Sequence, residues 1–303
     1  MIWLWTSIIS AVLLGLYDAA KKKSLDKNGV FDVLLYATAI STLFFLPLLL
    51  SSLFGWGLGA GTVFDVPQGS AVDHLTVASK ALLVAASWIF GILGMKHLPL
   101  TTVGIIKASR PVFVLLGCIF LFDERLNFLQ WGGVTIAIVA LYLLSRSSLR
   151  EGISFAHNKW IYCMAGSVIF GVASALYDKY IMSHFNQVFV QGWGNLYLTV
   201  IFAAAVLLAA FSARKKGEPV QRFRWDWTIL LIAIFITVSD FMYFYSLSCE
   251  GSMLSVISML RRSSVVITFI CGALLFKEQN LRAKALEMLL LLVGMALLLF
   301  GSY

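Results

Sequence analysis

The sequence has little charge. Of its 303 residues, 13% are Asp, Glu, Lys or Arg, against about 25% in soluble domains. Hydrophobic residues make up 60% of the chain, and its mean hydropathy is +0.89. A soluble protein cannot bury so much apolar surface, and a disordered chain is poor in apolar residues. This composition excludes a cytosolic enzyme and a disordered segment, and it indicates a polytopic helical membrane protein.

Cysteine and histidine are also scarce. The four cysteines lie in or beside apolar stretches without a CxxC spacing, so neither a disulfide framework nor a zinc site is expected. The four histidines fall in predicted loops, and the sequence contains no HExxH, GxSxG or Walker A motif and no acidic metal cluster. We therefore expect that the protein is not an enzyme, binds no cofactor or metal, and does not use ATP directly.

Apolar residues gather in ten runs of about the length that spans a bilayer. These runs cover residues 2–20, 32–54, 79–95, 99–122, 128–145, 159–178, 188–211, 227–248, 252–276 and 282–301. The sequence thus predicts an all-α bundle of ten transmembrane helices. The glycine-rich segment 55–76 is expected to form a longer loop, and residues 146–158 and 212–226 are expected to be linkers.

Basic residues collect on one side of the predicted bundle. No basic residue precedes the first apolar run and three lysines follow it, which is the reverse of a cleaved secretory signal. Sixteen lysines and arginines lie in the first, third, fifth, seventh and ninth connections, and three lie on the opposite side. Because cytoplasmic loops carry the basic excess, both termini are expected outside the cytoplasm, in a bacterial inner membrane. Orientation in the bilayer then accounts for the net charge of +8, and no nucleic acid partner is expected.

The chain contains an internal repeat. Residues 101–124 match residues 255–278 without a gap, at an offset of 154 residues. The matched polar positions include Ser109 with Ser263, Lys107 with Arg261, and Glu124 with Glu278. Each repeat holds five spans, and an odd number places the second copy upside down in the membrane. We therefore predict a 5+5 inverted-repeat bundle, formed by residues 1–146 and 159–303 around a linker at 147–158, as in alternating-access carriers.

One repeat resembles a known family. Residues 107–124, followed by 127–144, are similar to the repeat of the drug/metabolite transporter superfamily, EamA branch. The positions that carry the resemblance are Pro111, Gly117, Glu124, Gly133 and Ala140. The second copy departs from the pattern, with Val265 in place of the proline and Glu287 where a glycine is expected. The resemblance implies a 5+5 bundle that carries small metabolites. It does not identify the substrate, because members move amino acids, sugars, cations and phosphates.

Several ionisable residues lie well inside predicted spans, where an unpaired charge is costly. They are Lys107, Arg110, Asp240, Arg261 and Arg262. Lys107 and Arg110 are three residues apart, so they are expected on one helix face. Three explanations compete: internal pairing with Asp240 and Glu287, snorkelling of the basic side chains to an interface, and a cationic site for an anionic substrate.

We favour the cationic site, because two acids at most would face four cations. Asp240 is expected either to bridge Arg261 or Arg262 or to bind a proton, and Lys107 is assigned no acidic partner. A lysine in the fourth span with a basic pair in the ninth is also similar to plastid triose-phosphate translocators of the same superfamily, which hold phosphate with such residues. That similarity concerns Lys107, Arg261 and Arg262 alone.

Other side chains are candidates for the cavity wall and for gates. Trp88, Trp193, Asn195 and Tyr243 either bind polar groups of the substrate or simply pack between helices. A weaker echo of the repeat, at an offset of 160, relates Tyr17 and Asp18 to Tyr177 and Asp178. These pairs end the first and sixth predicted spans on opposite sides. They therefore suit an outer and an inner gate, and ordinary interfacial residues are the alternative.

The leading functional prediction is a secondary active transporter that moves a small organic anion, phosphorylated or carboxylated, by alternating access. The alternative is an EamA-type exporter of amino acids or other zwitterions, in which Asp240 binds the amine and an arginine binds the carboxylate. A membrane enzyme and a sensor or assembly factor are less well supported by the motifs. The expected partners are the substrate, the lipid bilayer and a coupling proton or counter-substrate, and the expected assembly is a monomer or a homodimer.

Overall fold

The computed structural model describes residues 2–110, 112–113, 127–149, 152–182, 184–215, 223–249, 257, 260–278 and 280–301. All regular secondary structure in these residues is helical. The helices are α1 (Ile2–Ser24), α2 (Val30–Phe54), α3 (Ala71–His97), α4 (Leu100–Ala108), α6 (Phe128–Leu149), α7 (Lys159–Met182), α8 (Gln187–Lys215), α9 (Trp227–Ser248), α11 (Ser264–Leu275) and α12 (Leu281–Phe300). Seven of them are long and apolar enough to cross a membrane. The predicted all-α polytopic fold is confirmed, while Pro111, Gly117 and Glu124 lie outside the described residues.

Several helices are longer than the hydropathy of the sequence predicts, and α6 and α8 run on to Leu149 and Lys215, into the predicted linkers. Helix α3 begins at Ala71, inside the predicted loop, because Ser70 and Asp73 form a reciprocal capping box at its start. His74, expected in a loop, therefore lies in the first turns of α3. Helices α1 and α7 run on to Ser24 and Met182, beyond their predicted ends at residues 20 and 178. Polar residues near these ends are thereby placed inside the bundle.

Two helices stop at matched serines of the repeat. Helix α4 ends directly before Ser109, and helix α11 begins directly after Ser263. Each serine donates its hydroxyl to the carbonyl three residues earlier, at 2.6 Å in both cases, and its amide bonds the same carbonyl. Such tight local bonds compete with the regular helical ladder. Each serine therefore marks an interruption within a span that the sequence predicts to be continuous.

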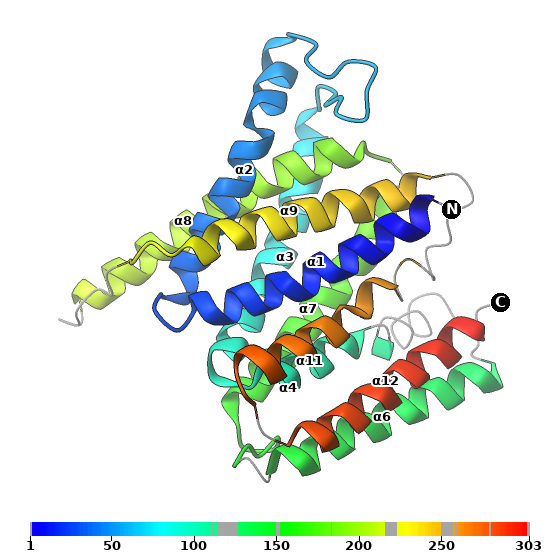
Figure 1. Cartoon of the computed structure of the whole chain (residues 1–303). Coiled ribbons are helices and arrows are strands. Elements are labelled where there is room, and N and C mark those ends of the chain that lie inside the picture. Colours follow the sequence, from blue (N-terminus) through cyan, green and yellow to red (C-terminus); the bar gives the residue numbers. More distant parts are fainter. Residues whose placement is uncertain are drawn as a thin grey trace.

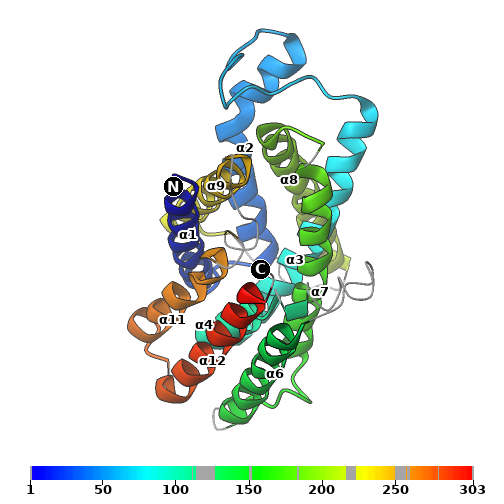
Figure 2. The same ribbon diagram turned by 90° about the vertical axis from the view of Figure 1, so that its right-hand side faces the viewer.

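The helices pack in pairs that relate the two halves of the chain. Helix α1 lies against α9 and α11, and α7 lies against α3 and α4 (Figures 1 and 2). Helix α2 packs on α8, α4 on α11, and α6 on α12. If α1, α2, α3, α4 and α6 are exchanged with α7, α8, α9, α11 and α12, these principal pairs are reproduced. The start of α1 and the end of α12 lie at the same end of the molecule (Figure 1).

Helices α6 and α12 form a close pair at one edge of the bundle (Figures 1 and 2). Gly133 and Gly294 meet there, and a Cβ atom on either residue would lie within 2.6 or 2.9 Å of the other's carbonyl oxygen. Glycines at a helix crossing let two backbones approach, as is common in membranes. Helices α1, α3, α4, α7, α9 and α11 line a central cavity.

Candidate substrate cavity

The central cavity has a volume of about 230 Å³ and a strongly charged lining. Its basic residues are Lys21, Lys80, Lys107, Arg110, Arg261 and Arg262, and its acidic residues are Asp18, Asp178 and Asp240. The lining thus carries six formal positive charges and three negative ones. Lys21 and Lys80 are additions to the predicted set, because the sequence places them at the ends of spans that prove longer than predicted. An excess of positive charge in an enclosed site attracts anions.

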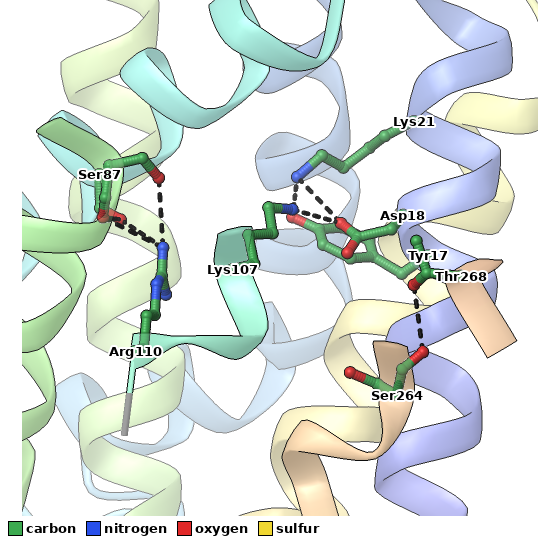
Figure 3. Close-up of polar contacts among 9 residues, drawn as sticks. Tyr17, Asp18, Lys21, Ser87, Lys107, Arg110, Ser264 and Thr268 are labelled. Atoms are coloured by element: carbon green, nitrogen blue, oxygen red, sulfur yellow. Dashed lines mark hydrogen bonds and ion pairs between the residues drawn. The ribbon is translucent and has the colours of Figure 1, made fainter. Parts of the chain in front are cut away.

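Asp18 is shared by two lysines. Its Oδ1 lies 2.7 Å from Lys107 Nζ and 3.9 Å from Lys21 Nζ (Figure 3). Lys21 Nζ also donates to the Tyr17 hydroxyl at 3.1 Å and lies 4.2 Å from the centre of that ring. The expectation that Lys107 has no acidic partner is therefore wrong. Asp18 reaches Lys107 because α1 continues past residue 20 and keeps this carboxylate inside the bundle.

The other two carboxylates also have basic partners. Lys80 Nζ lies 2.7 Å from Asp178 Oδ1, which joins α3 to α7. Arg261 donates to the Asp240 carboxylate, and its guanidinium carbon lies 4.0 Å from the centre of the Tyr243 ring. The predicted salt bridge of Asp240 with one of the two adjacent arginines is thus confirmed, with Arg261 as its partner.

Arg110 and Arg262 have no carboxylate partner among the described residues. Arg110 Nη2 instead donates to the Ser87 hydroxyl at 3.1 Å and to the carbonyl and hydroxyl of Ser167 at 3.1 and 3.2 Å. The Nε atoms of both arginines are buried and have no hydrogen-bond partner within the described part of the chain. Two of the three excess positive charges of the cavity therefore lie on these guanidinium groups, and the third is divided between Lys107 and Lys21, which share Asp18.

The interruption of α4 separates Lys107 from Arg110. Lys107 lies within α4 and points toward α1, whereas Arg110 follows the turn at Ser109 and points toward Ser87 on α3 (Figure 3). The expectation that both side chains share one helix face is therefore wrong, since it assumed a continuous helix.

Comparison with known proteins now identifies the family. Residues 1–146 and 158–300 both match the family model described as the EamA-like transporter family. The chain belongs to the EamA-like transporter family. It is therefore an integral membrane transporter, and membership of a family of transporters supports the expectation that it is not an enzyme. The resemblance to the EamA branch is confirmed.

The chain was also compared with curated proteins and with solved structures. No curated protein matches this EamA-like transporter. A solved structure described as "Crystal structure of protein" is similar to it, with a TM-score of 0.63 and 15% sequence identity. The similarity covers 99% of this chain and 98% of that chain. At this level of identity, the likeness concerns the fold alone.

The predicted wall residues of the transporter divide into two groups. Trp88 and Tyr243 line the central cavity. Trp193 packs instead against His74, with 4.6 Å between ring centroids, in a separate apolar cluster between α2, α3, α7 and α8. Asn195 borders a small pocket beside the cavity. Helix α8 packs on α2 and α3, and none of its described residues lines the central cavity.

The four predicted gate residues are also divided. Tyr17, Asp18 and Asp178 line the cavity, whereas the Tyr177 hydroxyl bonds the Ser79 hydroxyl at 3.1 Å outside it. The lining positions 14, 17, 18 and 21 of α1 recur with the same spacing at 171, 174, 175 and 178 of α7. This correspondence, an offset of 157 residues, aligns Lys21 with Asp178. The offset of 160 aligns Asp18 with Asp178. The positions that line the cavity follow the offset of 157 instead, so these two aspartates are not equivalent lining positions.

Proposed function

We propose that the protein is a secondary active transporter of a small organic anion, phosphorylated or carboxylated, in a bacterial inner membrane. The observation that carries this proposal is the pair of cavity arginines, Arg110 and Arg262, which have no carboxylate partner among the described residues. A buried guanidinium without a counter-charge is costly. A bound anion would supply the missing charge, and the planar fork of arginine matches carboxylate and phosphate oxygens.

We further propose that transport is by alternating access of two inverted five-helix repeats, residues 1–146 and 159–303. Three observations support this mechanism: the family match covers both halves, the principal helix pairs are reproduced when the halves are exchanged, and the interruptions at Ser109 and Ser263 have the same hydrogen bonds. Discontinuous helices around a central site are typical of such carriers. In this arrangement both termini face away from the cytoplasm.

The other charged residues take supporting roles in the proposed site. Lys107 and Arg261 are each held by an aspartate, so they shape the cavity and contribute to its field rather than offer a free charge. Trp88 and Tyr243 provide aromatic walls for the carbon skeleton of the substrate.

A zwitterionic substrate is less compatible with these contacts. Its amine would need a free carboxylate, and Asp18, Asp178 and Asp240 each already have a basic partner. An amino acid would therefore have to break an ion pair before it could bind in the cavity.

The test is transport by purified protein in liposomes. Uptake of labelled inorganic phosphate, glycerol 3-phosphate, succinate and alanine should be compared, with and without the same compound inside. We expect saturable uptake or exchange of an anion that Arg262→Gln weakens. Transport of alanine that no anion inhibits would contradict the proposal and favour the zwitterion exporter.

A further inference from the structure

The guanidinium of Arg110 is clamped between α3 and α7. Its Nη2 atom donates to three acceptors on Ser87 and Ser167 (Figure 3 shows the contact with Ser87). The Ser87 hydroxyl itself donates to the Ser167 carbonyl at 2.9 Å, which fixes the two helices relative to each other. One nitrogen of the guanidinium is thus occupied by the protein, while Nη1 makes no hydrogen bond to a described residue.

Glycines make room for this arrangement. The Arg110 guanidinium lies directly against Gly171 of α7, and a Cβ atom there would overlap its carbon and nitrogens. On α3, a Cβ atom at Gly91 would lie 2.7 Å from the Ser167 hydroxyl oxygen. The space beside Arg110 therefore depends on the absence of side chains at these two positions.

We propose that Ser87, Ser167 and Gly171 are positioning residues that orient Arg110 toward the transported anion. The serines hold Nη2, Gly171 sets the depth of the guanidinium, and Nη1 is left for the substrate. This inference rests on the proposed function. In this proposal Ser87, Ser167 and Gly171 raise the affinity for the anion only by holding Arg110 in place, and they do not bind the anion themselves.

The test uses substitutions that move or loosen Arg110 without removing its charge. Ligand affinity is measured by thermal-shift titration of the full-length protein with inorganic phosphate and with succinate. Gly171→Ala and Ser167→Ala should each weaken binding of the more strongly bound anion by roughly tenfold, the equivalent of one charge-assisted hydrogen bond. Ser167→Thr keeps the hydroxyl and should retain most of the affinity.

Two controls separate positioning from general damage. Gly166→Ala lies on the same helix, and its Cβ would meet only the Phe90 ring, at 3.4 to 3.6 Å, so it should bind normally. In an Arg110→Gln background, Gly171→Ala should cause no further loss of affinity, because its effect passes through the arginine.

The outcomes distinguish this inference from the proposed function. If neither anion stabilises the wild type, the anion proposal fails and this inference fails with it. If the wild type binds an anion and Gly171→Ala, Ser87→Ala and Ser167→Ala bind it equally well, the positioning role is refuted and the transport proposal stands. The serine variants decide the matter if Gly171→Ala does not fold.

A second inference comes from a different part of the molecule, at the start of α4. Glu278 lies in the connection between α11 and α12, and its carboxylate accepts from the Leu100 amide at 2.5 Å and from the Thr101 amide at 3.0 Å. The Thr101 hydroxyl donates to the same carboxylate at 2.5 Å. Pro99, at the N-cap of α4, makes no side-chain cap. A residue of the second half thus caps a helix of the first half, where a negative charge is stabilised by free amides and the helix dipole.

This end of the molecule is joined by further contacts. Lys22 Nζ donates to the carbonyls of Met95 and Leu98 at the end of α3, both at 2.7 Å. A Cβ atom at Gly272 of α11 would lie 2.8 Å from the Thr101 methyl group, so α11 and α4 touch there. The distribution of basic residues predicts that this end faces the cytoplasm.

We infer that Glu278 is a latch that closes the cavity at its cytoplasmic end, and that its release from α4 accompanies opening to that side. Only the hydrogen bonds from Leu100 and Thr101 hold the Glu278 carboxylate at the start of α4. Water can replace them once the carboxylate moves away. Because α4 leads directly to Lys107 and Arg110, displacement of its start would also move the cavity wall. This inference is independent of the substrate class.

The test measures from which side the cavity can be reached. In a full-length variant without native cysteines, Ser174→Cys places one thiol in the cavity lining. A membrane-impermeant maleimide is then applied to inside-out and to right-side-out vesicles. Glu278→Ala should raise labelling from the cytoplasmic side several-fold and lower labelling from the other side.

The matched control is Asp73→Asn, which alters a carboxylate at the start of α3 that caps only its own helix. The Asp73→Asn variant should be labelled to the same extent as the parent from the cytoplasmic side and from the opposite side. If Glu278→Ala lowers the melting temperature but labels like the control, Glu278 stabilises the fold alone and the latch is refuted.

Discussion

Two sets of basic residues line one cavity and differ in their partners. In the first set, Lys107 and Arg261 each contact an aspartate on a neighbouring helix. In the second set, Arg110 and Arg262 contact no carboxylate of the described residues. Residue type does not distinguish the sets, since each contains an arginine. The difference teaches that a charged residue in a membrane span indicates a site only after its partners are known.

The largest effect on stability is expected when a paired residue loses its partner. Asp18→Asn removes the carboxylate shared by Lys107 and Lys21 and leaves two buried ammonium groups uncompensated. We expect a loss of about 3–5 kcal/mol of stability, seen as a lower melting temperature in detergent. The double variant Asp18→Asn, Lys107→Gln should recover part of this loss. An Asp18→Asn variant that melts like the wild type would show that this pair contributes nothing to the fold.

The unpaired set should respond in the opposite way. Arg262→Gln removes a charge that strands no carboxylate, so the melting temperature without ligand should be unchanged or higher. Affinity for the transported anion should fall about 10- to 150-fold, as expected for a charge-assisted hydrogen bond of about 1.5–3 kcal/mol. Arg262→Lys should be intermediate, because lysine keeps the charge and loses the fork. Titration of each variant with phosphate and succinate measures the effect; lower stability with unchanged binding would place Arg262 in the scaffold.

Removing the partner of Arg261 moves this residue from the paired set to the unpaired set, so it tests directly whether an unpaired arginine favours binding of an anion. Asp240→Asn frees Arg261 and raises the formal charge of the cavity lining by one. The pair is partly accessible, so a moderate loss of about 1–3 kcal/mol is expected. Affinity for the anion should increase, as measured by the same titration. If binding weakens instead, Asp240 contributes to the site directly, by holding a proton or the substrate.

The smallest effect is expected for an acid outside the spans. Asp226 caps α9 by accepting from the Thr228 amide at 2.9 Å, and it lies 3.8 Å from Lys27. The hydrogen bond from Thr228 lowers the pKa of the Asp226 carboxyl from its usual value, and Lys27 lowers it further. Asp226→Ala should cost about 1 kcal/mol.

The sign of the pH dependence follows from the lowered pKa of Asp226. A carboxyl with a depressed pKa stabilises the fold above its unfolded value of about 3.9 and loses that contribution as the pH falls through the folded value. The difference in melting temperature between wild type and Asp226→Ala should therefore be constant from about pH 7 to pH 5 and shrink below about pH 4. A difference that grows in acid would contradict this assignment. Lys27→Gln, in an exposed pair, should change stability by less than about 1 kcal/mol.

The helices could largely be predicted from the sequence, because hydropathy is a local property. Errors occur where polar residues continue a helix, as in the capping box of Ser70 and Asp73, or interrupt one, as at Ser109 and Ser263. The interruptions fall at matched positions of a repeat that is visible in the sequence. A serine that bonds its own preceding turn has no distinct sequence signal, however, because serine also occurs in unbroken membrane helices.

The site could be predicted only in part. Lys107, Arg110, Arg261 and Arg262 stand out because charge is rare inside spans, and all four do line the cavity. Trp193 and Asn195 carry no such signal, and they lie elsewhere because α8 is outside the ring of helices around the cavity. Lys21 and Lys80 escaped notice because a lysine near the end of an apolar run has the same sequence pattern whether it faces water or a cavity.

The sequence alone thus determined that the protein is a helical membrane protein with a twofold repeat of the EamA type. Composition, run length and an ungapped match are properties of neighbouring residues, and they do not depend on how the helices pack. Only the tertiary structure decided which charges are paired, since Asp18 and Lys107 are 89 residues apart in the chain and yet 2.7 Å apart in space. That pairing leaves Arg110 and Arg262 without a carboxylate among the described residues, because the energy of a buried charge depends on the distance to its nearest counter-charge.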